Sequence, residues 1–175
     1  MYNRKVTKSY TINGARIFMK NFSGEERDKN PKGNRNFALY LDDEQLVEEL
    51  VNDGWPVKWF PPREGDPDQR PQAWMKIKIK FRYPPDVYLV TRKGKKKLTE
   101  HTIGQLDMTN IAQCDLTFSP YNYDASSVCP AGVSAYLREM YVVKSESELS
   151  AKYSNIDDID DISDPNGDDG MPFEV

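Results

Sequence analysis

Charged and aromatic side chains at every second position make residues 73–82 the segment best suited to chemistry. Apolar residues fill one set of alternate positions and Trp74, Lys76, Lys78, Lys80 and Arg82 fill the other. Successive side chains of a strand point to opposite faces, so this pattern predicts a strand with one core face and one cationic face. Same-face residues lie about 6.7 Å apart, a spacing at which cations can follow an extended chain of phosphates. The alternative is an edge strand whose lysines prevent aggregation.

Three further predicted strands place an aromatic residue beside a cation on the outward face. In residues 15–20 the alternation puts Met19 inward with two other apolar residues, after a hairpin-type turn at Asn13-Gly14 and a strand over 6–12. The other two strands cover residues 86–92 and 132–143. The outward groups are Phe18 with Arg16 and Lys20, Tyr88 with Arg92, and Tyr136 with Arg138.

The tip after residue 91 concentrates positive charge around Gly94. Five of the six residues from 92 to 97 are cations: Arg92, Lys93, Lys95, Lys96 and Lys97. A solvated turn accounts for one or two of them, whereas five favour a hairpin finger that contacts phosphates. Cations together with exposed ring faces are what unpaired nucleic acid needs, because bases stack on aromatic side chains while their phosphates meet lysine and arginine. Duplex DNA is a weaker partner, since its base faces are covered.

No combination of residues typical of an enzyme occurs in the chain. There is no glycine loop for phosphates and no nucleophile beside a base, and His101 is the only histidine. Cys114 and Cys129 lack the spacing of a zinc site. We therefore expect a protein that is not an enzyme and has no metal and no cofactor. A nuclease with scattered carboxylates is the alternative that the sequence leaves open.

The net charge of −4 averages two unlike parts of the chain. Residues 156–175 hold eight acids and no Lys or Arg, and the rest of the chain holds 24 basic and 20 acidic residues, a net charge of +4. Residues 145–175 are rich in Ser and Asp, a composition that cannot form a core. We expect a folded domain over 1–144 and a disordered acidic tail over 145–175.

The remaining segments predict a single, mainly β domain. Strands are expected over 36–41, 55–60 and 110–120, with Tyr40 outward. A helix follows Asp42-Asp43, turns Leu46, Val47, Leu50 and Val51 to one face and ends before Gly54. A short helix is expected over 99–108. The chain has no run of about 18 apolar residues and no apolar segment near its start, so we expect no membrane contact and a cytoplasmic location.

The last residues of the tail resemble a known protein family. The acidic tails of bacterial and bacteriophage single-stranded DNA-binding proteins end in acids followed by an apolar residue, proline and phenylalanine, which Asp168, Asp169, Met171, Pro172 and Phe173 match here. Unlike those tails, this one has Gly170 within the motif and Glu174 and Val175 after it. The body of the chain, from residues 13–22 through residues 137–141, also looks like a family of small phage proteins of that presumed role.

The resemblance implies an OB-fold-like barrel that coats single-stranded DNA without sequence preference in phage replication or recombination, in the host cytoplasm. Its tail residues 168, 169 and 171–173 would recruit replication or recombination proteins. Homo-oligomerisation stays open. The rival interpretation is an interaction or inhibitor protein whose acidic tail mimics nucleic acid and occupies a basic site on a host enzyme.

Overall fold

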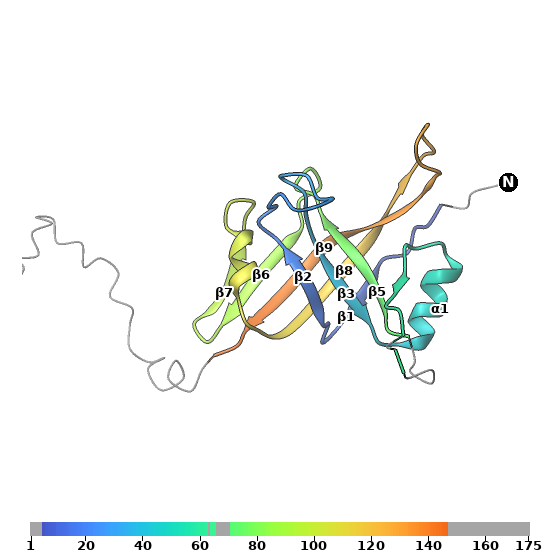
Figure 1. Cartoon of the computed structure of the whole chain (residues 1–175). Helices are drawn as coiled ribbons and strands as arrows, with labels where there is room; N and C mark the ends of the chain where they lie inside the picture. The colour runs from blue at the N-terminus through green and yellow to red at the C-terminus, as the bar shows by residue number, and fades with distance from the viewer. Residues whose placement is uncertain (1–4, 63, 66–70, 147–175) are drawn as a thin grey trace, which may run out of the picture. The chain divides into compact units, whose positions relative to one another are not determined.

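The computed structural model describes residues 5–62, 64–65 and 71–146, and this part of the chain is mainly β (Figure 1). Nine strands in these residues form one sheet. Their bounds are β1 Tyr10–Ile12, β2 Ile17–Asn21, β3 Arg35–Leu41, β4 Lys58–Trp59, β5 Ala73–Ile79, β6 Asp86–Thr91, β7 Gly94–Leu98, β8 Ile111–Tyr123 and β9 Gly132–Lys144. One α-helix, α1 (Glu44–Asn52), and one 3-10 helix, η1 (Ile103–Met108), complete the elements. The prediction of a mainly β domain with one full helix and one short helix is confirmed.

The sheet curls into a barrel whose end strands, β1 and β2, are paired with β8 and β3 and not with each other. The strand order is β1-β8-β9-β5-β3-β2; β4 pairs with the start of β5, and the β6–β7 hairpin joins β9. The two end strands, β1 and β2, follow each other in the chain. Between them, the backbone N–H of Ala15 donates to the carbonyl oxygen of Cys114 on β8 at 2.6 Å. The predicted hairpin at Asn13-Gly14 is therefore wrong: Gly14 does turn the chain with φ 64°, but β1 pairs with β8 and β2 with β3.

The inward face of each strand supplies the core. On β5, Met75, Ile77 and Ile79 are buried, which confirms the alternation expected for this strand. They pack with buried side chains of β3, β8 and β9, including Phe37 and Phe118. Burial of such side chains stabilises a fold by roughly 1.5 to 3 kcal/mol each, so the inward face fixes which residues must point outward.

Helix α1 is anchored at its first turn and on one face. The Asp43 carboxylate accepts hydrogen bonds from the backbone of Gln45 and Leu46, and Leu50 is fully buried. Val51, expected on the same face, is 43% exposed. At 3.6 residues per turn it lies about 100° from Leu50, beyond the edge of the buried stripe. Among the described residues, no helix is long and apolar enough to cross a membrane.

A bulge in β2 reverses one predicted side chain. The pairing of β2 with β3 shifts between Phe18 and Asn21, and Met19 adopts φ 48° and is 63% exposed. The expectation that Met19 points inward is wrong because the extra residue of a bulge is left out of the alternation.

Several strand ends differ from the predicted ones for reasons of pairing. β5 stops at Ile79 instead of residue 82, because a turn follows in which the N–H of Tyr83 donates to the carbonyl of Lys80. β1 and β4 are shorter than predicted, at three and two residues. β8 is longer, since its last residues continue to pair with β9 beyond the barrel as a projecting hairpin (Figure 1).

Candidate nucleic-acid interface

The outward face of β5 carries the predicted cationic row at the middle of the sheet. Trp74 and Lys78 are half-buried and Lys76 is exposed, so this face is open to solvent. Antiparallel pairing sets Tyr40 of β3 opposite Trp74, and parallel pairing sets Tyr136 of β9 beside Lys78. Paired residues lie on the same face of a sheet. The outward face of β5 is therefore continued on both sides by aromatic residues.

Four aromatic rings gather at the first end of β5. This four-ring cluster consists of Phe18, Tyr40, Phe60 and Trp74. Phe18 stacks on Tyr40 with ring centroids 4.2 Å apart, and Phe60 stacks on Trp74 at 5.8 Å. Phe18 also meets Trp74 edge-on at 5.7 Å. Rings at such distances attract each other through dispersion and their quadrupoles, so the cluster holds a firm aromatic surface in place.

Cations border the four-ring cluster. The Arg16 guanidinium lies 4.5 Å from the Tyr40 ring centre, and the Lys58 ammonium 5.2 Å from that of Trp74. Two hydrogen bonds at 2.6 and 3.0 Å join Arg16 to the carboxylate of Asp42. This contact holds the pKa of the Asp42 carboxyl below its usual value. Arg16 is thus oriented over the cluster by a planar, two-point ion pair.

Lys78 is the most enclosed cation of the row. Burial, followed by repulsion from Lys80 and Lys76, lowers the pKa of its ammonium. Its Nζ donates to the hydroxyl of Ser134 on β9 at 3.2 Å. An ammonium that has lost part of its hydration is stabilised in its charged form by a nearby anion, so this position suits a phosphate.

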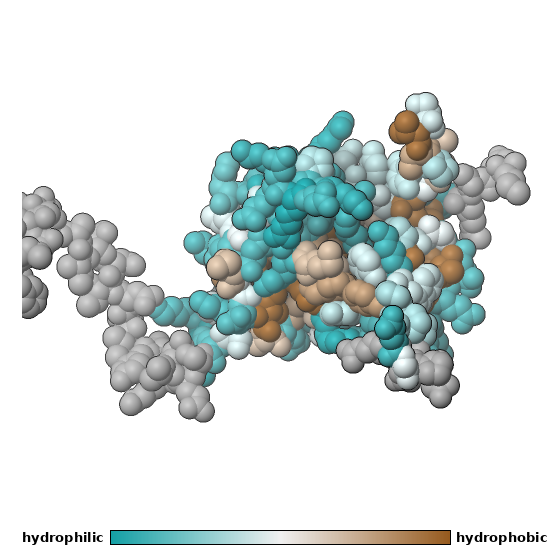
Figure 2. Space-filling view, in the orientation of Figure 1, coloured by the Kyte–Doolittle hydropathy of each residue, from teal (hydrophilic) through white to brown (hydrophobic). Residues whose placement is uncertain are grey.

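Three tyrosines lie beside Lys78 where the projecting hairpin leaves the barrel. In this tyrosine triad, Tyr121 and Tyr136 stack with centroids 4.6 Å apart and planes at 2°, and Tyr83 lies 6.3 Å from each. Burial raises the pKa of Tyr136. The hairpin tip beyond the triad carries one strongly hydrophobic patch among more polar residues (Figure 2), and Val128 there is 92% exposed.

A tyrosine pair on β6 and β9 forms the third aromatic group. Tyr88 and Tyr141 stack at 5.0 Å with planes at 17°. The Lys95 ammonium of β7 lies 4.9 Å from the Tyr88 ring centre and 5.8 Å from that of Tyr141. The predicted finger is a two-stranded hairpin, with Arg92 and Lys93 at its turn.

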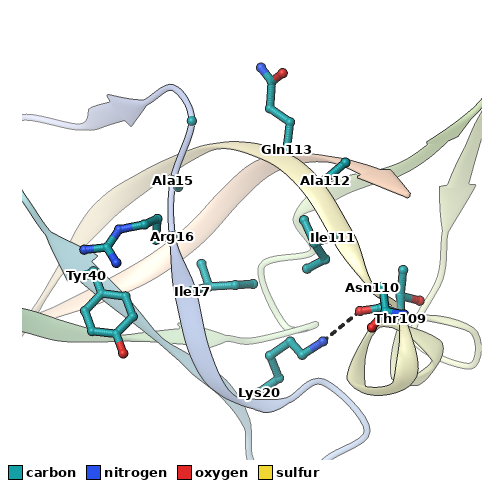
Figure 3. Close-up of a pocket in the computed structure, with 11 residues that line it drawn as sticks. Ala15, Arg16, Ile17, Lys20, Tyr40, Thr109, Asn110, Ile111, Ala112 and Gln113 are labelled. Carbon is teal, nitrogen blue, oxygen red and sulfur yellow. Dashed lines mark hydrogen bonds between the residues drawn. The ribbon is translucent and has the colours of Figure 1, made fainter. Parts of the chain in front are cut away.

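Lys20 does not lie beside Phe18, as the alternation predicted. Its Nζ donates to the carbonyls of Leu106 and Thr109 at 2.9 and 3.0 Å, at the end of η1. Figure 3 shows this side chain reaching toward Thr109, away from Tyr40. The bulge at Met19 causes the change, because it shifts the positions that follow. The prediction of Lys20 as an outward cation of the aromatic face is wrong.

The space between β2 and the start of β8 is a cavity of about 690 Å³. Its walls include Ile17, Lys20 and Ile111, and it meets the four-ring cluster at Tyr40, beside Arg16 (Figure 3). It lies where β2 and β8 separate after the hydrogen bond of Ala15 to Cys114. The cavity therefore borders the aromatic face and shares the Tyr40 side chain with it.

Most predicted site residues lie on the outward face or the finger. Phe18, Trp74, Tyr88 and Tyr136 are all half-buried, and Arg138 is exposed at a bulge of β9. Lys80 and Arg82 follow the end of β5, with Arg82 5.9 Å from the Tyr83 ring centre. The predicted partner-binding residues Asp168, Asp169, Met171, Pro172 and Phe173 lie outside the described residues.

Sequence reasoning missed several rings and one cation of this face: Tyr40, Phe60, Tyr83, Tyr121, Tyr141 and Lys58. A signal existed for three of them. Alternation placed Tyr40 outward and put Lys58 and Phe60 opposite Trp59, but nothing local joined them to Trp74. Within the part of the chain that the structure describes, no group of three or more His, Cys, Asp or Glu residues could hold a metal ion.

Comparison with known proteins identifies relatives of the chain. A family model described as "Putative phage ssDNA-binding domain" matches residues 2–174. No curated protein sequence matches. The single-stranded DNA-binding protein from bacteriophage Enc34 in complex with ssDNA is similar in structure, with 11% identity, a TM-score of 0.51, and coverage of 79% of this chain and 88% of that chain.

Two further solved structures are similar. A second structure of the single-stranded DNA-binding protein from bacteriophage Enc34 shares 11% identity over 84% of this chain and 88% of that chain, with a TM-score of 0.49. The single-stranded DNA-binding protein gp2.5 encoded by bacteriophage T7 shares 15% identity over 89% and 98%, with a TM-score of 0.44. The match to the Enc34 complex confirms the predicted fold class, an OB-fold-like barrel with added helices.

Proposed function

Because the chain belongs to the phage ssDNA-binding domain family, we propose that it coats single-stranded DNA without sequence preference during phage replication or recombination. Its family is one of binding domains, not of enzymes. The observation that carries the proposal is the open face of β5, where Lys76 and Lys78 lie between the four-ring cluster and the tyrosine triad. Two lysines flanked by rings on one open face can meet the phosphates and the bases of the same strand.

The rings supply affinity that does not depend on sequence. Stacking of an unpaired base on an aromatic side chain contributes about 1 to 3 kcal/mol, and every base has a face to stack. Phe18, Trp74, Tyr88 and Tyr136 are the proposed stacking residues, joined by Tyr40 and Phe60 through the four-ring cluster. Duplex DNA offers no such faces, so we expect a preference for single strands.

The cations hold phosphates along the same face. The proposed phosphate contacts are Arg16, Lys76, Lys78, Lys80, Arg82, Arg138 and the finger residues Arg92, Lys93, Lys95, Lys96 and Lys97. Binding of each phosphate releases counterions, so affinity should fall with salt at a log–log slope of about −0.7 per phosphate. The partly desolvated Lys78 supports this assignment, because its ammonium lacks much of its water before DNA arrives.

The acidic tail is proposed to act separately from the body. Residues 1–144 would form the DNA-binding domain and residues 145–175 the tail, which would recruit replication or recombination proteins through Asp168, Asp169, Met171, Pro172 and Phe173. When DNA is absent, the eight acids of residues 156–175 would fold back on the basic face that phosphates occupy in the complex. Deleting residues 156–175 should therefore leave DNA binding equal or tighter. A body that does not bind DNA, together with loss of function on this deletion, would favour the rival role of the tail as a nucleic-acid mimic.

Fluorescence anisotropy with labelled poly-dT tests the proposal. The double variant Trp74→Ala with Lys78→Glu should weaken binding severely, since it removes a ring and reverses a charge. Trp59→Ala is the matched control: Trp59 is 47% exposed on the neighbouring β4, but lies in a groove beside α1 that does not include the four-ring cluster. Unchanged affinity in the double variant, or an equal loss in the control, would exclude this face as the binding site.

A further inference from the structure

The tyrosine pair lies on the same face as the other two aromatic groups but apart from them. Tyr141 of β9 is paired with Asp115 of β8 and with Tyr88 of β6. Between Tyr136 and Tyr141, the bulge leaves Arg138 and Glu139 both exposed, with Leu137 and Met140 buried on either side. The bulge thus compensates for an odd separation and keeps Tyr136 and Tyr141 on one face.

Parallel strands place the three aromatic groups in a single order. β5 and β9 run in the same direction, and Lys78 is paired with Tyr136. Trp74 lies four residues before Lys78, and Tyr141 lies five residues after Tyr136. At roughly 3.3 Å per residue, the triad lies about 13 Å along β5 from Trp74, and the tyrosine pair about 16 Å farther along β9. A strand of DNA that follows the sheet meets the four-ring cluster, the triad and the tyrosine pair in turn.

The charges around the tyrosine pair make it the weaker of these sites. Lys95 lies over both rings, whereas Lys97 is held by Asp86 at 2.9 Å. Glu139 is hydrogen-bonded to Tyr141, and both it and burial raise the pKa of that tyrosine. Two carboxylates beside the pair oppose phosphates, while β5 presents only cations on its outward face between Trp74 and Lys78. A short strand should therefore occupy the β5 end first.

We propose that Tyr88 and Tyr141, with Lys95 above them, form a separate base-stacking site that single-stranded DNA occupies only when it is long enough to extend past the tyrosine triad. The inference rests on the proposed function. It adds the expectation that affinity for single-stranded DNA rises in a step once the oligonucleotide reaches this site. The ligand is an unpaired base of any kind, because stacked rings and one ammonium supply no pattern that distinguishes bases.

Titration with oligothymidylates of graded length tests this site. Lengths of about 4, 8, 12 and 16 nucleotides cover the site sizes of OB folds. The wild-type chain should show a step in affinity between two of these lengths. The double variant Tyr88→Ala with Tyr141→Ala should lose roughly fivefold to 150-fold in affinity for the longer oligomers, the equivalent of one stacked base. This loss should exceed the loss for the shortest oligomers.

A pair of lysine variants gives a test that leaves the rings in place. Lys95 and Lys96 are neighbours on β7, but only Lys95 lies over Tyr88 and Tyr141; Lys96 is paired with Leu89, which packs against the core. Lys95→Met should weaken binding of long oligomers more than binding of short ones, and the loss for long oligomers should exceed that caused by Lys96→Met. Thermal unfolding of all variants checks that each one folds.

The outcomes separate this inference from the proposed function. Equal losses at every length, or no loss at any length in a variant that folds, would overturn the separate site while leaving DNA binding by the wild type intact. Equal effects of Lys95→Met and Lys96→Met would overturn it as well. Failure of the wild-type chain to bind any oligomer would overturn the proposed function itself.

Discussion

Replacing Lys78 by methionine should strengthen the fold and weaken DNA binding at the same time. Burial lowers the pKa of this lysine, so the folded chain holds its proton less firmly than the unfolded chain does. Between the folded-state pKa and the ordinary lysine value, the unfolded chain binds more protons, and stability rises with pH across that window. At neutral pH the charged form therefore costs stability. Methionine keeps the apolar stem and removes that cost.

The two effects of Lys78→Met have different magnitudes. The hydrogen bond to Ser134 is lost and offsets part of the gain, so the free energy of unfolding should rise by less than about 1 kcal/mol. Loss of one phosphate contact should make the log–log salt slope shallower by about 0.7. When salt falls from 1 M to 0.15 M, the affinity of the variant should therefore rise by roughly fourfold less than that of the wild type.

Lys76→Met is the matched control for this prediction. Lys76 lies two residues earlier on the same face but is exposed, so its removal should change the salt slope equally and leave stability within about 0.5 kcal/mol. Urea unfolding at neutral pH and anisotropy titrations over a tenfold range of NaCl measure both quantities. A fall in stability for Lys78→Met, or an unchanged slope, would refute the argument that a desolvated ammonium is kept here for a phosphate.

Three further predictions concern other parts of the domain. Burial raises the pKa of Cys114 to about 12, whereas Cys129 is exposed. A thiol reagent such as DTNB should therefore modify one cysteine quickly in the native chain and two in denaturant. Two fast thiols in the native chain would contradict the buried position of Cys114. Asp42→Asn should lower stability at pH 7 by less than about 1 kcal/mol, because the ion pair with Arg16 is more than half exposed. Since the pKa of Asp42 is lowered, the stability difference from wild type should vanish as pH falls through that pKa. A difference that persists in acid unfolding experiments would rule out the ion pair as its cause. Ala38→Leu should cost roughly 1 to 3 kcal/mol of stability and weaken DNA binding, because Ala38 is 3% exposed between Phe18 and Lys76 on the outward face; a variant with normal unfolding and normal anisotropy would show that the rings are not packed as described.

Local alternation predicted the face that each side chain of β5 takes, because burial of Met75, Ile77 and Ile79 fixes the direction of their neighbours. It failed at Met19 and Lys20, where a bulge depends on how β2 pairs with β3. The charge of the finger was likewise visible in the sequence, since a two-residue turn needs no distant partner.

Assembly of the aromatic groups could not be predicted from the sequence. Tyr40, Phe60 and Trp74 meet only because β3 and β4 both pair with β5. Tyr136 reaches Lys78 through a parallel pairing of β5 with β9, which no local pattern specifies. The length of β8 also follows from its partner β9 instead of its own composition. Strand pairing thus determines which residues of the site come together, whereas the sequence alone identifies only the separate segments.

The parallel pairing of β5 with β9 has a consequence for the order of events during synthesis. β9 is the last described strand to leave the ribosome, yet it lies at the centre of the sheet, between β8 and β5. Contacts between segments so far apart in the chain form slowly, because a long loop must close first. An incomplete nascent chain therefore lacks the middle of the barrel, and DNA capture must wait for nearly the whole domain to be translated.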